Sequence, residues 1–322
     1  MFKTTAFLAS LVFVLSFSHT ANASSFDQWL SGVRKEAAQK GISQNTINAA
    51  LNGIKPIPRV IELDRKQPEG RMTFNEYYTK VINQRRIDEG RKMYRQHRTE
   101  LERAASKYGV PANYIVALWG IETNYGSNTG GFKVIPALAT LAHDGRRSKF
   151  FRTELMNAMK IIDQGHISAA TMKGSWAGAM GQNQFMPSSF HAFAVDGNSD
   201  GKRDIWGSLP DVFASTANYL AKSGWREDQR WGREVKLPSG FSKSLTGLEV
   251  KKPPSEWKNR GVTLPSGGAL PTAQGMKASV VTPDGLAGRT FLVYDNYSVI
   301  MKWNKSTYFA TSVGLLADDI AR

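Results

Sequence analysis

The stretch ALWGIETNYG, residues 117–126, places one carboxylate, Glu122, in a run of strongly apolar residues. Glu122 follows Leu118 by four residues and Trp119 by three, the spacing of neighbours on one helix face. The opposite face is also apolar, so we expect a buried helix. Burial penalises a charged carboxyl and should raise the pKa of Glu122. A carboxyl that keeps its proton near neutral pH can act as a general acid; the alternative is a structural glutamate paired with a distant arginine.

A second segment, SWAGAMGQNQFMPSSF at residues 175–190, groups polar and aromatic side chains that suit a sugar. Ser175 and Gln184 offer neutral hydrogen bonds, and aromatic residues such as Trp176 offer flat apolar faces. A sugar ring matches this combination because it is hydroxylated at its rim and apolar across its faces. The glycines and alanines of the segment also predict a close helix contact, and both interpretations can hold together.

The composition narrows the class of protein. The chain has 322 residues, 41% of them hydrophobic, which is enough for a buried core and two or three subdomains. It has no cysteine, which excludes disulfides, thiolate metal sites and lipid attachment through an N-terminal cysteine. The formal charge of +15 is spread along the chain. It predicts either a basic solvated surface or an anionic partner, namely nucleic acid or an acidic polymer at the cell surface.

Residues 1–23 have the pattern of an export signal. Lys3 precedes an apolar run at 6–17, and Ala21-Asn22-Ala23 forms a small-x-small cleavage pattern. The run is short for a bilayer span, although an uncleaved membrane anchor is the alternative. We expect a mature, soluble chain from about Ser24 onward, in the bacterial periplasm because it has no disulfides. Export argues against nucleic acid as the partner.

Local patterns predict mostly helices, followed by a small antiparallel β element in the Gly-, Pro- and Ser-rich residues 232–298. The expected helices lie at 26–51, 74–108, 112–124, 148–163, 168–173, 187–193, 209–223 and 298–320. The expected domains are a helical region at 24–107, a core at 108–231, a β-rich subdomain at 232–298 and a C-terminal helix at 299–322 that returns to the core.

Five motifs occur in a fixed order along most of the mature chain. They are GIETNYG (120–126), GRRSKFFRTEL (145–155), AGAMGQNQFMPSSF (177–190), DGNSDGKRDIW (196–206) and ANYLAKSGW (217–225). With these motifs the chain resembles the lytic murein transglycosylase B family. The resemblance implies an α+β, mainly α fold: a lysozyme-like catalytic core with a helical N-terminal region and a small antiparallel β insertion.

The resemblance also implies an activity. Members of that family cleave the β-1,4 bond between N-acetylmuramic acid and N-acetylglucosamine in peptidoglycan without water, leaving a 1,6-anhydro end. One glutamate, at the position of Glu122, protonates the leaving oxygen and then takes a proton from the sugar's C6 hydroxyl. No cofactor is required. Most glycosidases instead use two carboxyls about 5–9.5 Å apart; the acids nearest Glu122 in sequence, Glu102 and Asp144, do not lie in strongly apolar helices.

Further substrate-contacting positions follow from the resemblance alone. They are Ser175, Gln184, Tyr219, Asn304, Tyr77, Arg146 and Arg147. The two arginines would suit the carboxylates of the peptide stem, and each of the seven side chains has an alternative structural interpretation. The family has Gly-Tyr-Gly-Gln-Phe where this chain has GQNQF at 181–185. We expect this difference to place two amides beside the cleft and to alter subsite preference.

An acidic loop predicts a structural calcium site. The expected ligands are Asp196, Asn198, Asp200 and Asp211. The alternating oxygen donors before Gly201 resemble the start of an EF-hand loop. However, Gly207 stands where the standard loop has glutamate, and two basic residues lie inside it. The alternative is an Asx-rich turn held by its own hydrogen bonds.

Two other functions remain open at this point: a muramidase on the same fold that uses water, and a peptidoglycan-binding protein without catalysis. The presence of Glu122 together with Ser175, Gln184 and Asn304 favours the enzyme. The expected partners are peptidoglycan glycan strands, with no nucleic acid and no membrane span once the signal is removed. Cell-wall enzyme partners are left unspecified.

Overall fold

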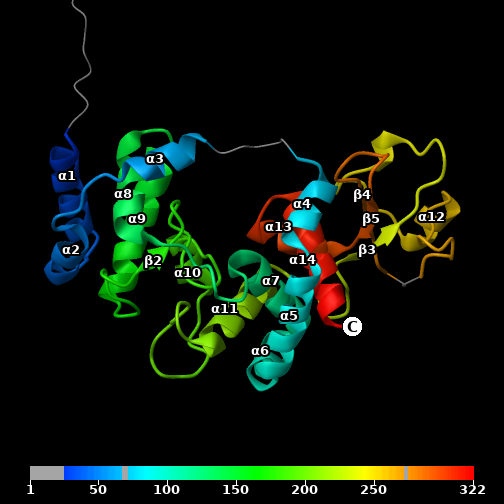
Figure 1. Cartoon of the computed structure of the whole chain (residues 1–322), viewed down its shortest axis with the longest axis horizontal. Coiled ribbons are helices and arrows are strands. Elements are labelled where there is room, and N and C mark those ends of the chain that lie inside the picture. The colour runs from blue at the N-terminus through cyan, green and yellow to red at the C-terminus, as the bar shows by residue number, and fades with distance from the viewer. Residues whose placement is uncertain (1–24, 67–71, 272–274) are drawn as a thin grey trace, which may run out of the picture.

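Helices dominate the computed structural model, which describes residues 25–66, 72–271 and 275–322, and two small antiparallel sheets accompany them (Figure 1). This is the α+β, mainly α architecture that the sequence predicts. The predicted export signal lies outside the described residues. Within those residues, no helix has the length and apolar character needed to cross a membrane.

The elements alternate between long buried helices and short connecting ones. The helices are α1 (Phe26–Gln39), α2 (Gln44–Leu51), α3 (Pro58–Arg65), α4 (Phe74–Val81), α5 (Gln84–Gln96), α6 (Arg98–Tyr108), α7 (Ala112–Thr123), α8 (Val134–Asp144), α9 (Ser148–Asp163), α10 (Pro187–Phe193), α11 (Leu209–Lys222), α12 (Pro254–Asn259), α13 (Asp295–Trp303) and α14 (Thr307–Ile320). The strands are β1 (Phe132–Lys133), β2 (Lys173–Gly174), β3 (Gly232–Val235), β4 (Ser279–Val281) and β5 (Thr290–Val293).

Helix α7 is the buried helix predicted around Glu122. Every residue from Tyr114 to Gly120 is buried, and α5, α6, α11 and α14 pack around it. The helix ends in a tight turn because Asn124 and Tyr125 both adopt left-handed backbone angles, with φ of 49° and 59°. Tyr125 folds back onto α7 so closely that a Cβ at Gly120 would lie 2.6 Å from its ring. Glycine at 120 is therefore required by packing.

The helices of the expected region 24–107 pack in two separate groups (Figure 1). Helices α1, α2 and α3 gather with α8 and α9, whereas α4, α5 and α6 pack on α7, α11 and α14. Buried apolar residues of both groups belong to one continuous core cluster with α7 and α14. The N-terminal helices therefore do not form one bundle. Three of them pack with α8 and α9, and the other three pack with the helices around α7, which carries Glu122.

A three-stranded antiparallel sheet, in the order β3-β5-β4, confirms the predicted β element. It has its own small apolar cluster, which includes the fully buried Trp257. Arg289 joins this sheet to α4, since it forms a bidentate ion pair with Glu234 of β3 and lies 5.8 Å from the Phe74 ring centroid. Asp284 adds a second link by accepting the backbone N–H of Phe74 at 2.6 Å.

Some predicted elements are wrong in detail. Residues 168–173 form no helix, because the Ser168 hydroxyl accepts the backbone N–H of Thr171 and closes a turn before β2. The expected helix at 74–108 is three helices, and the Asn83 side chain caps the start of α5. The expected helix at 26–51 is likewise divided between α1 and α2, and the one at 298–320 between α13 and α14.

Helices α3 and α8 were not expected from the sequence. Pro58 occupies the first turn of α3, where a proline needs no backbone partner. Helix α8 is buried on all sides from Val134 to Ala142, apart from Pro136, so its sequence lacks the polar face that marks an amphipathic helix.

A buried ion pair ties α3 to the connection between α8 and α9. The side chain of Asp64 is 2% exposed and accepts hydrogen bonds from Arg146 at 2.6 Å and Arg147 at 2.7 Å. The hydrogen bond from Arg146 is the main cause that lowers the pKa of Asp64, against the opposing effect of burial. A carboxyl with a lowered pKa stabilises the fold above its unfolded pKa of about 4, and this contribution is lost at lower pH.

We expect Asp64→Ala to lower the free energy of unfolding by about 2 kcal/mol at pH 7, because it leaves two arginines without their buried partner. Glu102→Ala is the matched control, since Glu102 forms an exposed pair with Arg98 and should contribute less than about 0.5 kcal/mol. Urea denaturation measures both. The deficit of Asp64→Ala should shrink below about pH 4; equal deficits for the two variants would contradict this account.

Candidate active site

Glu122 lies in the last turn of α7, where the helix emerges from the core. Its side chain is partly exposed, and Trp303, the last residue of α13, donates its indole N–H to the Glu122 Oε1 at 2.8 Å. None of the ion pairs in the described part of the chain involves Glu122. The alternative of a structural glutamate paired with an arginine is therefore not what the structure contains.

Burial raises the pKa of Glu122 to about 7, and the hydrogen bond from Trp303 acts in the opposite direction. The raised pKa confirms the expectation from the sequence. At neutral pH the carboxyl is therefore present in both protonation states. It can donate a proton and then accept one, which is the property required of a residue that acts as both acid and base.

Aromatic side chains form a wall beside the carboxyl. The ring centroid of Trp303 lies 4.6 Å from that of Tyr219 and 5.2 Å from that of Phe185. The Tyr219 hydroxyl donates to the backbone carbonyl of Lys302 at 2.7 Å, which fixes the end of α13 and so the position of Trp303. Trp303 was not singled out in the sequence, although it directly precedes Asn304; its contact with Glu122 spans 181 positions.

Ser175 and Gln184, both predicted to contact substrate, each use some of their hydrogen-bonding groups within the fold. The Ser175 hydroxyl accepts the backbone N–H of Ala179 at 3.0 Å, and the Gln184 amide donates to the Gly181 carbonyl at 2.9 Å and to the Thr129 carbonyl at 3.1 Å. Both residues are partly exposed. The Ser175 O–H and the Gln184 carbonyl oxygen are the remaining groups that could meet a ligand.

Asn304 and Tyr77 come from opposite ends of the chain. Asn304 is exposed, and its side-chain oxygen accepts the backbone N–H of Ser306 at 3.1 Å. Burial is the main cause that raises the pKa of Tyr77, and the charge of Glu122 adds to it. Tyr77 is therefore within electrostatic reach of Glu122, although α4 and α7 are separate in sequence.

The structure adds to two expectations about neighbouring residues. Arg146 and Arg147 both bond to Asp64, and their side chains stay 49% and 42% exposed, so their contact with the peptide stem stays a prediction. The amides at 182 and 183 were expected beside the cleft, which is wrong: Gln182 is 9% exposed and Asn183 2%. Gln182 accepts the indole N–H of Trp119 at 2.8 Å and so holds a buried side chain of α7 in place.

The acidic loop is closed by its own hydrogen bonds. Asp196 accepts the backbone N–H groups of Ser199 and Gly201, and the buried Asp211 accepts those of Gly197 at 2.8 Å and Asp204 at 2.6 Å. In the described part of the chain, no three acidic or histidine side chains are placed to hold a metal ion. The structural calcium site at Asp196, Asn198, Asp200 and Asp211 therefore stays a prediction, and no catalytic step is assigned to the ion.

The fold and the site together define a class: a mainly helical enzyme in which one carboxyl of raised pKa lies against an aromatic wall. The comparison with known families agrees. Residues 25–318 match the family described as Transglycosylase SLT domain, and the chain belongs to this family. It is an enzyme of the lytic transglycosylase type with a lysozyme-like fold.

Individual relatives cover nearly the whole chain. SltB3 from Pseudomonas aeruginosa, solved in complex with NAG-anhNAM-pentapeptide, is 45% identical with a TM-score of 0.90, over 92% of this chain and 80% of its own. Membrane-bound lytic murein transglycosylase B of Escherichia coli K12 is 29% identical over 321 residues, 95% of this chain and 84% of its own. Escherichia coli Slt35, solved in complex with calcium, is 29% identical with a TM-score of 0.77, over 95% and 94%.

We expect Glu122→Gln to be more stable than the parent enzyme at high pH. The folded pKa of about 7 lies above the unfolded pKa of about 4.3, so the parent loses stability as pH rises through this interval, while the amide does not titrate. Allowing for partial exposure, the difference should reach about 2 kcal/mol above pH 7 and vanish below about pH 4. Thermal unfolding across pH measures it; a constant difference would contradict the raised pKa.

We expect Asp211→Ala to lower the free energy of unfolding by about 2 kcal/mol, because it leaves two partly buried backbone N–H groups, those of Gly197 and Asp204, without their acceptor. The loss should be equal in EDTA and in calcium. Asn198→Ala, at an exposed position of the same loop, is the control. A calcium-dependent rise in the melting temperature of the parent that Asp211→Ala abolishes would show instead that the loop chelates the ion.

Proposed function

We propose that this enzyme cleaves the β-1,4 bond between N-acetylmuramic acid and N-acetylglucosamine of peptidoglycan without water, with Glu122 as its sole acid and base. One observation carries the proposal: the pKa of Glu122 is raised to about 7 by burial, and no described carboxylate contributes to that shift. A second catalytic carboxyl about 5–9.5 Å away would add a like charge and raise the pKa further.

In the first step, the Glu122 carboxyl gives its proton to the glycosidic oxygen. The C1–O bond of the muramic acid residue breaks, and the N-acetylglucosamine leaves with that proton. The new Glu122 carboxylate keeps the indole N–H of Trp303 as a hydrogen-bond donor, which favours its charged form. The positive charge that develops at C1 lies close to this carboxylate.

In the second step, the C6 hydroxyl of the same muramic acid attacks C1. Glu122 takes the hydroxyl proton, the 1,6-anhydro ring closes, and the carboxyl returns to its starting state. All atoms of the product come from the substrate, so no water and no second carboxyl are consumed. A single group with a pKa of about 7 can serve both steps near neutral pH.

The remaining predicted residues would hold the glycan. Ser175 and Gln184 each keep one polar group beyond those that the fold uses, and the exposed Asn304 adjoins Trp303. Tyr77 and Tyr219 would contribute aromatic surface beside Glu122. SltB3, to which this chain is 45% identical, binds NAG-anhNAM-pentapeptide, which supports a glycan with an anhydro end as ligand.

We further propose that the enzyme acts in the periplasm, on the anionic wall. The formal charge of +15 favours attraction to a polyanion, and the N-terminal pattern of residues 1–23 favours export. The predicted division into a helical region, a core, a β-rich subdomain and a returning C-terminal segment is part of the same proposal. The separate apolar cluster of the β-rich part supports it.

Mass spectrometry of the products tests the proposal. Residues 24–322 should release from peptidoglycan muropeptides lighter than the hydrolytic products by one water. Glu122→Gln should lower this release by at least about a thousandfold because the amide cannot exchange a proton. Glu102→Gln, at an acid on the outer face of α6, is the matched control and should retain activity.

The other functions give different products. Reducing muramic acid ends would show a hydrolase that uses water and would require a search for a second carboxyl. A folded protein that binds insoluble wall and releases nothing would show a binding role. Full activity of Glu122→Gln would remove Glu122 from the mechanism altogether.

A further inference from the structure

Gln182 forms four hydrogen bonds that join α7 to the segment that follows the acidic loop. Its side-chain oxygen accepts the indole N–H of Trp119 at 2.8 Å, and its backbone carbonyl accepts the Thr123 hydroxyl at 3.1 Å. On the other side, its backbone N–H donates to the Ile205 carbonyl at 2.8 Å, and its side-chain amide donates to the Trp206 carbonyl at 3.0 Å. The residue is 9% exposed, so these bonds are sheltered from water.

The two α7 partners of Gln182 lie on either side of Glu122. Trp119 precedes Glu122 by three residues, and Thr123 follows it directly. The Thr123 hydroxyl also accepts the backbone N–H of Gly126 at 3.1 Å, which ties down the turn after the helix. Gly126 has a left-handed φ of 81°, and a Cβ there would collide with the Gln182 side-chain oxygen. The last turn of α7, which carries Glu122, is therefore packed directly against Gln182.

The segment that receives Gln182 is itself fixed by contacts that do not involve α7. Ile205 is fully buried. The Asp204 side chain accepts the backbone N–H of Trp206 at 2.9 Å, and the Trp206 indole N–H donates to the Lys173 carbonyl at 3.0 Å. Gln182 therefore links the end of α7 to a support whose position is set by the rest of the core.

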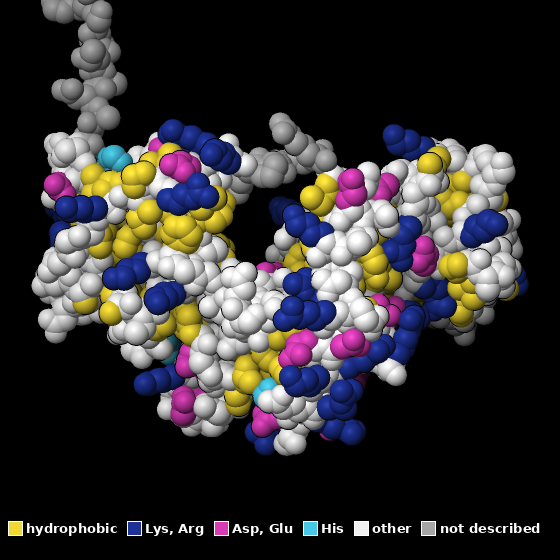
Figure 2. Space-filling view, viewed as in Figure 1, with side chains coloured by type: hydrophobic (Ala, Val, Ile, Leu, Met, Phe, Trp, Pro, Cys, Tyr) yellow, Lys and Arg dark blue, Asp and Glu magenta, His cyan; other side chains and the backbone are white. Residues whose placement is uncertain are grey.

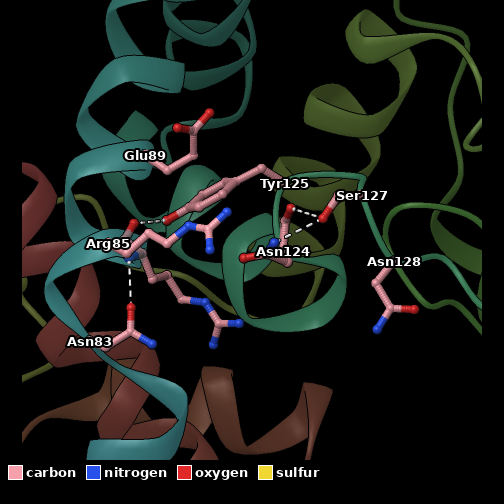
Figure 3. Close-up of a pocket in the computed structure, with 8 residues that line it drawn as sticks. Asn83, Arg85, Glu89, Asn124, Tyr125, Ser127 and Asn128 are labelled. Atoms are coloured by element: carbon pink, nitrogen blue, oxygen red, sulfur yellow. Dashed lines mark hydrogen bonds between the residues drawn. The ribbon is translucent and has the colours of Figure 1, made fainter.

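The opposite side of the turn after α7 faces a cavity (Figure 3). This cavity has a volume of about 620 Å³ and lies between the turn and the start of α5. The Tyr125 hydroxyl bridges the two segments by donating to the backbone carbonyl of Arg86 at 2.7 Å. Asn124 and Ser127 bond to each other within the turn, at 2.8 Å. Close support for the end of α7 therefore comes largely from the side of Gln182.

We propose that Gln182 is a positioning residue for the cleavage reaction: it holds the Glu122 carboxyl in place by fixing the last turn of α7. The inference rests on the proposed function and adds to it the residue that fixes the acid and base. Glu122 must reach two oxygens of the substrate in turn, and a displacement of about 1 Å can lower a rate by about a hundredfold. An amide suits this junction because it accepts a hydrogen bond from α7 and donates one to the Trp206 carbonyl.

Gln182→Met tests this inference, because it keeps the length of the side chain and removes both of its polar groups. On soluble peptidoglycan strands, kcat should fall about tenfold while KM changes by less than about twofold, since the groups proposed to hold the glycan have hydrogen bonds of their own. The fall of kcat/KM at alkaline pH should also move to lower pH. A loosened last turn admits water to Glu122, and burial then raises its pKa less.

Asn183→Leu is the matched control. It removes the neighbouring buried amide, which donates to the Val212 carbonyl at 2.8 Å and to the Thr216 hydroxyl at 2.7 Å, both on α11. This variant should lose stability in thermal unfolding but keep the kcat and the pH profile of the parent enzyme. Gln182→Glu should recover part of the parent's kcat as pH falls, because a protonated carboxyl can accept from α7 and donate to the Trp206 carbonyl.

A double variant tests the route through α7. In Trp119→Phe, which removes the indole N–H, adding Gln182→Met should lower kcat little further, because the first change has already broken the link. An unchanged kcat and pH profile in folded Gln182→Met would overturn the inference and leave the proposed function intact. Equal losses of kcat in Gln182→Met and Asn183→Leu would also overturn it, since they would show a general effect of packing. If Glu122→Gln keeps full activity in the same assay, the proposed function fails first, and this inference fails with it.

Discussion

A carboxyl held in an apolar helix without a cationic partner is the constraint on which this structure depends. Folding places Glu122 where burial opposes its charge, and the indole N–H of Trp303 is the compensating interaction that the described residues provide. An arginine at this place would stabilise the fold but hold the carboxyl ionised. The protein therefore retains a carboxyl whose charged form is opposed by burial, and active sites commonly keep such unfavourable groups.

The surrounding fold keeps this carboxyl in place from two directions. From within, Gly120 lets Tyr125 pack against α7, and Gln182 holds Trp119 by its indole N–H. From outside, α13 follows directly after the β-rich part and carries Trp303 to Glu122.

Figure 2 shows basic side chains over many parts of the visible face, so attraction to an anionic polymer is a property of the surface as a whole, whereas the chemistry is local.

The sequence predicts best what is local. The spacing of apolar residues in α7 is enough to expect burial of Glu122 and a raised pKa, because both follow from one helix. Contacts between segments that are far apart in the sequence are harder to predict. Trp303 lies 181 positions from Glu122, and no sequence pattern connects the two residues. Arg146 and Arg147 were assigned by resemblance, yet Asp64 of α3 binds them. The amides at 182 and 183 point inward because Trp119 and Thr216 offer buried partners, which sequence spacing does not show.

The most direct test of this account is the pKa of Glu122 itself. Protein labelled with ¹³C at the glutamate side-chain carboxyl carbon can be titrated by NMR, and the Glu122 signal is identified by its absence from Glu122→Gln. The midpoint for Glu122 should lie at about 7. A midpoint near the ordinary value of about 4.3 would mean that the carboxyl is ionised at neutral pH and cannot be the proton donor described here.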